Sequence, residues 1–422
     1  MAFRFVHTAD IHLDSPLRSL SLRNRALADL IGDSTRQAFV AIVDLCLSEQ
    51  VDALVIAGDL YDGDQTSMKT ARFLAAQMQR LGQAGIAVYV IRGNHDALSR
   101  ITQELILPPT VKVYSGRAEA VEIERGGLAV AMHGLSFARP QAPESLLPKY
   151  RPPLPDRVNI GLMHTSLDGA PGHDVYAPCR LADLQASGFD YWALGHIHQR
   201  SQHDGRTTVV MPGMPQGRDI NEAGSKSVSL VTIHDDRRLS VEERSTSIAE
   251  FDRLAVDLSD AVSWFDAVEA IETVVSSART RSASEHLVAR LSLTGRTPLS
   301  WRLRRDRDLL LAEAEQRAEG IGRTWIEKIE IATEPPSDPV TQPSADPVVE
   351  LDALMRDDVS RRHAVREEIR RMVKDLRDDL PPESRGFTGA DEQEFEAFVD
   401  RLLAEGGSDV IARLKTDGVE AN

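Results

Sequence analysis

Near the start of the chain, apolar runs rich in β-branched residues alternate with longer segments whose apolar residues recur every three or four positions. The runs at residues 3–9, 53–57 and 86–91 predict buried strands, and the segments at 33–50 and 66–83 predict amphipathic helices. This β-α-β-α-β order with short connections is typical of a mostly parallel sheet with helices on its faces.

Farther along, the pattern consists of strand-like segments separated by loops. They lie at 111–114, 120–124, 128–133, 159–164, 191–194, 207–211, 227–234 and 239–245. We expect these additional strands to form a second sheet that packs on the first. The predicted fold is therefore α/β, with a four-layer α/β/β/α sandwich.

Beyond residue 250 the pattern changes. Strands at 254–258, 287–293 and 324–332 alternate with helices at 264–279 and 305–316, which predicts a small α+β unit. Prolines then concentrate in an extended linker, because proline fixes φ and has no backbone donor. Two amphipathic helical segments follow, and they must pair with each other, dock on the rest of the chain or bind a partner. The predicted parts are residues 1–247, 248–333, 334–350 and 351–416.

The composition limits the cellular compartments and the kinds of binding partner that fit this chain. The only cysteines are Cys46 and Cys179, which favours a reducing cytoplasm over a disulfide framework. The N-terminus predicts a strand rather than a signal peptide, and no apolar run approaches the roughly 18 residues of a membrane span. We therefore expect a cytoplasmic protein without a membrane segment. The formal net charge of −16 excludes non-specific coating of nucleic acid, which depends on lysine and arginine.

Five polar clusters follow apolar strands in the first half of the chain. Open α/β sheets build their sites beyond the carboxyl ends of strands, so these clusters can meet. Aspartate, histidine and asparagine are ligands for divalent metals such as manganese or zinc, and two such ions form a phosphoester-cleaving centre. Each cluster alone is more often a turn or a cap, but the five in this order are specific. They are Asp10-Ile11-His12, Gly58-Asp59-Leu60-Tyr61-Asp62, Gly93-Asn94-His95-Asp96, Met163-His164-Thr165 and Gly195-His196-Ile197-His198.

These clusters resemble the five motifs of the calcineurin-like metallophosphoesterase superfamily, over about residues 1–235. The later segments are similar in layout to the SbcD-type DNA repair exonucleases, particularly their YhaO-like branch. The resemblance implies a nuclease domain at 1–247, a capping domain at 248–333 and a partner-binding helical region at 351–416.

The resemblance also implies roles for single residues. His95 would lie beside the scissile phosphate and protonate the leaving oxygen, while Asp96 orients its ring. At Asp62, many relatives nearer the SbcD type carry a histidine, so a phosphate contact at this position stays open. The two ions, expected to be Mn²⁺, would activate a water as the nucleophile. Asp10, His12 and His198 would bind the first ion, Asp59 would bridge both, and Asn94, His164 and His196 would bind the second.

Four further residues are ambiguous. His7 and His133 lie in apolar strands, where a hydrogen-bonded core histidine is more common than a ligand. His173 either lines the substrate cleft or is simply exposed. For Arg218, a surface salt bridge is the favoured interpretation, and a contact with a substrate phosphate is the alternative.

The function implied by the resemblance is a manganese-dependent DNA exonuclease or endonuclease that acts in DNA repair. Its partners would be DNA, a second copy of the chain and an SMC-like coiled-coil ATPase of the SbcC type, bound through the C-terminal helices. One alternative is a small-molecule phosphodiesterase or phosphatase, which needs the same metal site. Another is a scaffold that has kept only the fold. The segments after residue 250 favour the nuclease.

Overall fold

A computed structural model describes residues 2–15, 25–61, 67–97, 107–169, 175–336, 347–380, 382–389 and 391–415. Asp62 and His173 lie outside the described residues, as does most of the predicted linker. The chain divides into two compact units. Unit 1 comprises residues 1–253, 278–289 and 323–327, and unit 2 comprises residues 254–277, 290–322 and 328–422.

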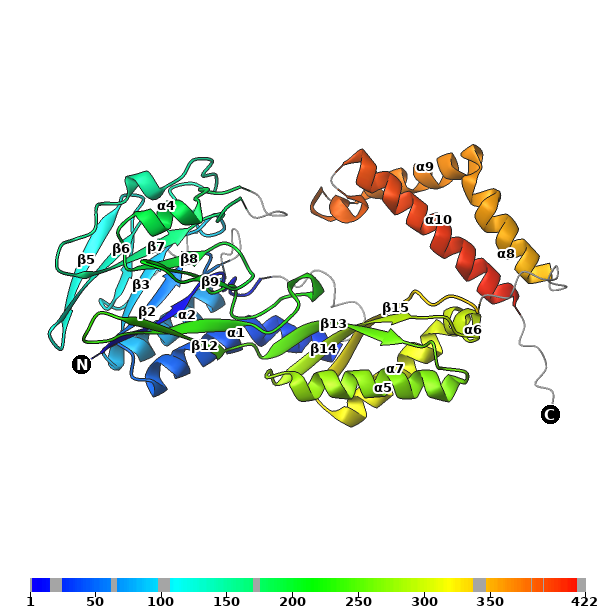
Figure 1. Ribbon diagram of the computed structural model, residues 1–422, viewed down its shortest axis with the longest axis horizontal. Coiled ribbons are helices and arrows are strands. Elements are labelled where there is room, and N and C mark those ends of the chain that lie inside the picture. Colours follow the sequence, from blue (N-terminus) through cyan, green and yellow to red (C-terminus); the bar gives the residue numbers. More distant parts are fainter. Residues whose placement is uncertain are drawn as a thin grey trace. The chain divides into compact units, whose positions relative to one another are not determined.

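The first sheet has the strand order β12-β11-β1-β2-β3-β4 (Figure 1). Strands β1 to β4 are parallel, which confirms the predicted parallel sheet, whereas β11 and β12 extend it antiparallel beyond β1. This addition places β1, the carrier of the first motif, inside the sheet. The bounds are β1 Phe3–Thr8, β2 Ala53–Ala57, β3 Ala87–Ile91, β4 Val111–Val113, β11 Ser227–Ile233 and β12 Leu239–Ser245.

The second sheet has the order β5-β6-β7-β8-β10-β9. Its central strands β6, β7, β8 and β10 are parallel, and the two outer strands pair antiparallel. The short β9 was not predicted from the sequence. The bounds are β5 Glu119–Arg125, β6 Leu128–Gly134, β7 Val158–His164, β8 Tyr191–Gly195, β9 Ser201–His203 and β10 Thr208–Met211.

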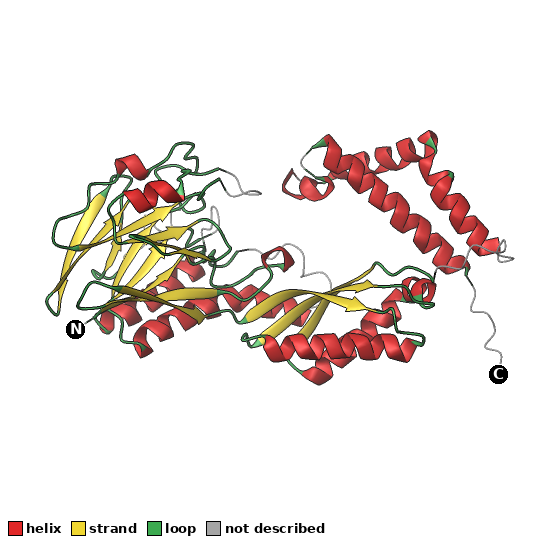
Figure 2. Cartoon of the chain, in the orientation of Figure 1, coloured by secondary structure: helices red, strands yellow, loops and turns green. Residues whose placement is uncertain are grey.

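Three apolar layers hold the sheets and helices of unit 1 together, and they confirm the predicted α/β/β/α sandwich (Figure 2). Helices α1 (Arg25–Ser48) and α2 (Met68–Gln83) cover the first sheet. Residues such as Phe5 and Tyr191 fill the space between the sheets. The short helix α4 (Leu181–Ala186) covers the second sheet through Leu184.

Helix α1 begins earlier than the sequence pattern predicts. Its first turns bury Leu27 and Ile31 against Ile220 and Phe251, which come from far along the chain. Such a tertiary contact leaves no local periodicity, so the predicted start near residue 33 was late.

The α+β unit contains a sheet in the order β13-β14-β15. Two of its strands and two of its helices lie close to the predicted segments, whereas β13 begins at Ala249 rather than at 254 and α6 was not predicted. The bounds are β13 Ala249–Asp257, α5 Trp264–Arg281, β14 His286–Thr294, α6 Ser300–Arg305, α7 Arg307–Ile321 and β15 Thr324–Ile331.

The C-terminal helices of unit 2 pack on one another through buried Val373, Phe395 and Val399. Pairing, one of the open alternatives, is thus confirmed. The described helices include none with the length and apolar character to cross a membrane. The helices are α8 (Pro347–Asp357), α9 (His363–Asp379) and α10 (Glu392–Leu414), and the short 3₁₀ helices are η1 (Leu147–Lys149), η2 (Ile220–Glu222), η3 (Val359–Arg361) and η4 (Pro382–Thr388).

His7 and His133 are hydrogen-bonded core histidines, as predicted. His7 Nε2 lies 3.0 Å from the carbonyl oxygen of Leu194, so this nitrogen carries the proton. Its Nδ1 then accepts from the Tyr191 hydroxyl at 2.9 Å. Burial lowers the pKa of His7 from 6.5 to about 3.

This lowered pKa makes His7 a source of acid sensitivity. Below pH 6.5 the unfolded chain protonates His7 while the folded protein does not, so stability is lost as the pH falls toward 3. The loss approaches about 1.4 kcal/mol per pH unit. In urea unfolding between pH 7 and 4, we expect His7→Gln to be less stable at pH 7 but to lose less on acidification. The exposed His234→Gln serves as control, and a His7→Gln curve parallel to the parent would contradict this assignment.

Candidate metal centre

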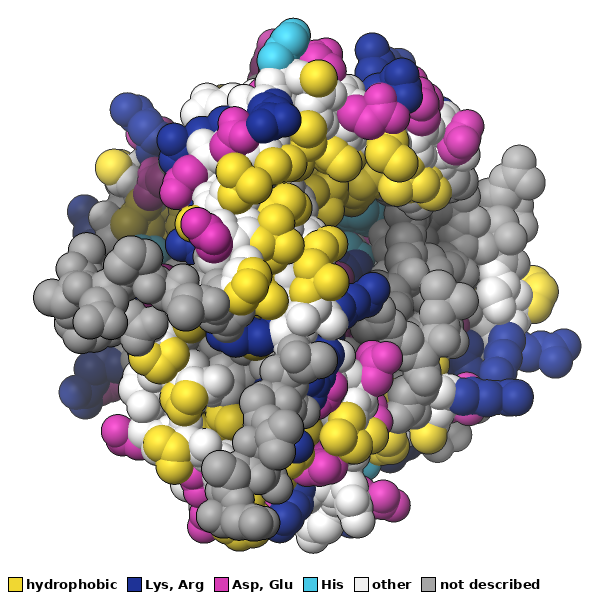
Figure 3. Space-filling view, turned by 90° about the vertical axis from the view of Figure 1, so that its right-hand side faces the viewer, with side chains coloured by type: hydrophobic (Ala, Val, Ile, Leu, Met, Phe, Trp, Pro, Cys, Tyr) yellow, Lys and Arg dark blue, Asp and Glu magenta, His cyan; other side chains and the backbone are white. Residues whose placement is uncertain are grey.

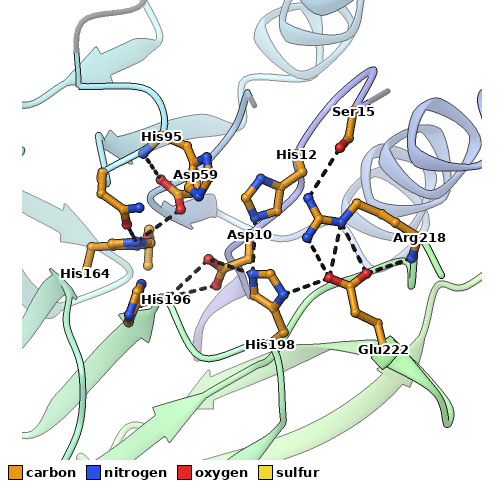
Figure 4. Close-up of polar contacts among 12 residues, drawn as sticks. Asp10, His12, Ser15, Asp59, His95, His164, His196, His198, Arg218 and Glu222 are labelled. Atoms are coloured by element: carbon orange, nitrogen blue, oxygen red, sulfur yellow. Dashed lines mark hydrogen bonds and ion pairs between the residues drawn. The ribbon is translucent and has the colours of Figure 1, made fainter. Parts of the chain in front are cut away.

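Each predicted ligand comes from a strand's carboxyl end or the loop that follows it, and both sheets contribute (Figure 4). The loops after β1 and β2 are joined by backbone hydrogen bonds from Asp10 to Gly58 and from His12 to Asp59, each 3.1 Å long. The second sheet joins them through His196, whose N–H lies 3.1 and 2.9 Å from the two Asp10 carboxylate oxygens. The sandwich therefore brings the five clusters to one place.

Asp10, His12 and His198 form one group of potential metal ligands, whose donor atoms lie within 4.8 Å of one another. The Nε2 atoms of His12 and His198 lie 3.2 Å apart. His198 Nε2 is 4.0 Å from the Asp10 carboxylate. These are the three residues assigned to the first ion.

A second group consists of Asp10, Asp59 and His164. His164 Nε2 lies 3.3 Å from Asp59 Oδ2 and 3.0 Å from Asn94 Oδ1. The ring of His196 stands at 68° to the ring of His164, with centroids 5.2 Å apart. The residues assigned to the second ion are thus close together, whereas the bridging role of Asp59 stays a prediction, since Asp10 is the residue common to both groups.

Four of these residues have positive φ angles, which residues other than glycine rarely adopt. The φ angles of Asp10, His12, Asp59 and His196 are 51°, 45°, 51° and 104°. A non-glycine residue there costs about 1–3 kcal/mol, so the surrounding fold must hold it. Such strain at four neighbouring positions is typical of a functional site, and no sequence pattern indicates it.

Two glycines allow the strands to approach closely around His164. A Cβ on Gly93 would overlap the Asp59 carboxylate and the His164 ring. A Cβ on Gly195 would overlap the carbonyl oxygen of Ala57 on the other sheet. The first residue of each of these two motifs must therefore be glycine for the neighbouring groups to pack this closely.

The electrostatics of the cluster suit a cation. Burial, aided by the positive charge of Arg218, lowers the pKa of His12 to about 3, so its imidazole is neutral. Burial opposes charge on His164 too, but Asp59 raises the pKa of His164 to about 9 and its own pKa is depressed in return. Buried carboxylates need a compensating charge, which a divalent ion supplies together with ligand bonds. Carboxylate oxygens and imidazole nitrogens at these distances fit such an ion.

Asp96 joins two of the loops. Its carboxylate accepts the backbone N–H groups of Leu60 at 3.0 Å and Gly93 at 2.6 Å. Burial and the negative charge of Asp59 raise the pKa of Asp96 to about 7. These contacts hold the Asp59 loop beside the Asn94 loop, while the orientation of the His95 ring by Asp96 stays a prediction.

His95 differs from the other eight predicted site residues in being exposed. Its backbone N–H donates to Asp59 Oδ1 at 3.0 Å, and its ring lies edge-on to the His12 ring, with centroids 5.0 Å apart. His95 is therefore fixed at the cluster, with its side chain accessible to a substrate.

The structure adds a residue that sequence reasoning missed. Glu222 Oε1 lies 2.9 Å from His198 Nδ1, and Arg218 binds the same carboxylate (Figure 4). The predicted salt bridge of Arg218 is confirmed, but it lies at the cluster rather than on open surface. Glu222 lies 24 residues after His198, beyond strands β9 and β10, so its spacing from the last motif carries no periodic signal.

Two family models match the chain. The model described as "Calcineurin-like phosphoesterase" matches residues 3–200, and "Metallophosphoesterase YhaO, middle domain" matches residues 251–334. The chain is 33% identical over 340 residues to the "Uncharacterized metallophosphoesterase YhaO" of Bacillus subtilis, a match that covers 78% of this chain and 82% of that protein.

More distant relatives have names that refer to DNA repair or to nuclease activity. "DNA double-strand break repair protein Mre11" of Methanopyrus kandleri is 23% identical to this chain over 59% of this chain's length. The match spans 54% of that relative's own length. A subunit of the nuclease SbcCD of Escherichia coli is 26% identical over 58% of this chain and 69% of its own length. Among solved structures, a dimetal phosphatase from Danio rerio has 15% identity and a TM-score of 0.36 over 58% of this chain and 96% of that one.

Proposed function

The chain belongs to the calcineurin-like metallophosphoesterases of the YhaO type, and from this premise we propose that it is a two-metal, manganese-dependent DNA nuclease. The observation that carries the proposal is the convergence of two ligand groups, which share Asp10, beside the exposed His95. The donor set fits borderline divalent ions, and manganese is the ion that we propose.

Two divalent ions supply Lewis acidity and an activated water when bound. Asp10, His12 and His198 would hold the first ion and Asn94, His164 and His196 the second, and Asp59 would contribute to both. His95 is held at the cluster by its backbone contact to Asp59 and has an exposed side chain, so its protonated imidazolium form could give a proton to the leaving oxygen. Asp96 keeps the loops of Asp59 and His95 in register through its two amide contacts.

DNA as the substrate is supported by the names of the Mre11 and SbcCD relatives. The match of residues 251–334 to a YhaO middle domain supports a capping domain at 248–333, which a minimal phosphodiesterase would not need. The domain division given above is part of this proposal, as are a cytoplasmic location and a homodimer.

An SMC-like coiled-coil ATPase is the proposed partner, and the C-terminal helices are its proposed contact. Helix α9 exposes Met372 and Leu376, whose side chains are 59% and 54% accessible. Helix α10 exposes Val410 and Leu414 near its end. Figure 3 shows hydrophobic side chains gathered on the face toward the right of Figure 1. Such exposed apolar side chains on helices suit a helical partner.

The function is tested by metal removal and substrate choice. We expect chelation to abolish cleavage of linear duplex DNA and Mn²⁺ to restore it, alone or with a co-purified ATPase, because the ions would supply the Lewis acidity that the reaction needs. Bis-p-nitrophenyl phosphate and cyclic nucleotides serve as competing substrates. If kcat/KM for a cyclic nucleotide were far higher than kcat/KM for DNA, both with and without the ATPase, the proposed nuclease function would be wrong. A small-molecule phosphodiesterase would then be the better assignment.

A further inference from the structure

A carboxylate lies behind one of the proposed metal ligands. Glu222 Oε1 is 2.9 Å from His198 Nδ1, on the side of the ring opposite His12 (Figure 4). Because a carboxylate only accepts, His198 Nδ1 must carry the proton. The lone pair on His198 Nε2 is then directed toward His12 Nε2, 3.2 Å away, and toward Asp10.

Arg218 holds this carboxylate in a fixed orientation. The backbone N–H of Arg218 donates to Glu222 Oε2 at 2.8 Å, and its Nη2 donates to Oε1 at 2.6 Å. Its Nε lies 3.2 Å from both oxygens. A planar guanidinium paired in this way fixes the plane of the carboxylate as well as its charge.

The same arginine reaches the first motif. Arg218 Nη1 lies 3.3 Å from Ser15 Oγ, and the Ser15 N–H donates to the carbonyl oxygen of His12 at 3.0 Å. A continuous chain of contacts thus runs from His198 through Glu222 and Arg218 to the loop that carries His12. With four of its donor groups engaged, Arg218 is better placed to orient Glu222 than to bind a substrate phosphate.

The element that carries Glu222 is itself well anchored. Glu222 ends η2, which Asp219 caps by accepting the Asn221 N–H at 2.7 Å. Ile220 of the same turn is buried against Leu27 and Phe251. The Glu222 side chain is 11% accessible and that of Arg218 is 22%, so this pair is more enclosed than an ordinary surface salt bridge.

We propose that Glu222, clamped by Arg218, is a positioning residue that fixes the tautomer and ring orientation of His198 for the first metal ion. The proposal rests on the proposed function, because it takes His198 as a ligand. Partners of this kind contribute about 10- to 100-fold in metal affinity when a histidine binds an ion. His198 is the proposed ligand that Glu222 contacts, and His12, whose loop Arg218 reaches, is assigned to the same ion, so the effect of Glu222 is confined to the first of the two ions.

The experiment is calorimetric titration of chelator-stripped protein with Mn²⁺. We expect two binding events in the parent and, in Glu222→Ala, a loss of about 10- to 100-fold at one of them and little change at the other. Glu222→Gln keeps an acceptor for His198 and is expected to retain more affinity than Glu222→Ala. Glu49→Gln is the matched control, because Glu49 also pairs with an arginine, Arg4, at 2.6 Å.

A double variant separates positioning from a general structural role. If Glu222 acts through His198, then His198→Ala combined with Glu222→Ala binds Mn²⁺ no more weakly than His198→Ala alone. Additive losses, equal losses at both sites, or unchanged affinity in Glu222→Ala would overturn the proposal. Absence of Mn²⁺ binding by the parent would instead contradict the proposed function, so the two failures are distinguishable.

Discussion

Replacement of Asp59 by asparagine is expected to reduce phosphoester cleavage by about a thousandfold or more and to remove at least one bound Mn²⁺. Several kcal/mol of transition-state stabilisation come from ions at such a site, and each 1.36 kcal/mol is worth about tenfold in rate. Asparagine keeps the shape of Asp59 but not its charge, which His164 and any bound ion both require.

The measurement for Asp59→Asn is kcat with metal content by mass spectrometry. Asp44→Asn is the control, because Asp44 pairs with Arg80 on the surface of the same unit. An Asp59→Asn protein with two ions and near-parental kcat would show that Asp59 is not a ligand.

Replacement of His95 by glutamine is expected to lower kcat on DNA by about 100- to 10,000-fold while both ions stay bound. His95 contributes no proposed ligand atom, and its side chain is exposed at the site. Its loss therefore removes a proton donor and not the metal centre. A substrate with a p-nitrophenolate leaving group needs less protonation, so its kcat is expected to fall less.

The comparison of the two substrates decides the role of His95. Equal losses on DNA and on bis-p-nitrophenyl phosphate would contradict a general acid. A lowered metal content in His95→Gln would instead make His95 a contributor to ion binding. His234→Gln, at an exposed histidine between β11 and β12, gives the baseline for both measurements.

The sequence predicts the fold well where local periodicity coincides with burial. Strand β2 was predicted with its observed bounds, Ala53–Ala57, because every residue in it is buried. The predicted helix at 33–50 was too short at its start. The first turns of α1 are stabilised by contacts with Ile220 and Phe251, which no local pattern reveals. The first of the two amphipathic segments predicted after the linker was expected to be one helix, whereas the structure has α8 and α9 separated by η3.

The site shows the same division. Gly93-Asn94-His95-Asp96 and Gly195-His196-Ile197-His198 are dense enough in donors to be recognised in the sequence, and the structure brings them together. The positive φ angles at Asp10 and His196 could not be predicted, because they depend on the loops around them. Glu222 was missed for a related reason, since it becomes a partner of His198 only when η2 packs against the start of α1.

The most direct test of a two-metal site bridged by Asp59 is anomalous diffraction from crystals grown with Mn²⁺. We expect two manganese peaks about 3.5–4 Å apart. One peak should be bound by Asp10, His12 and His198, and the other by Asn94, His164 and His196, with the Asp59 carboxylate between them. A single peak, or two peaks without Asp59 between them, would contradict such a site.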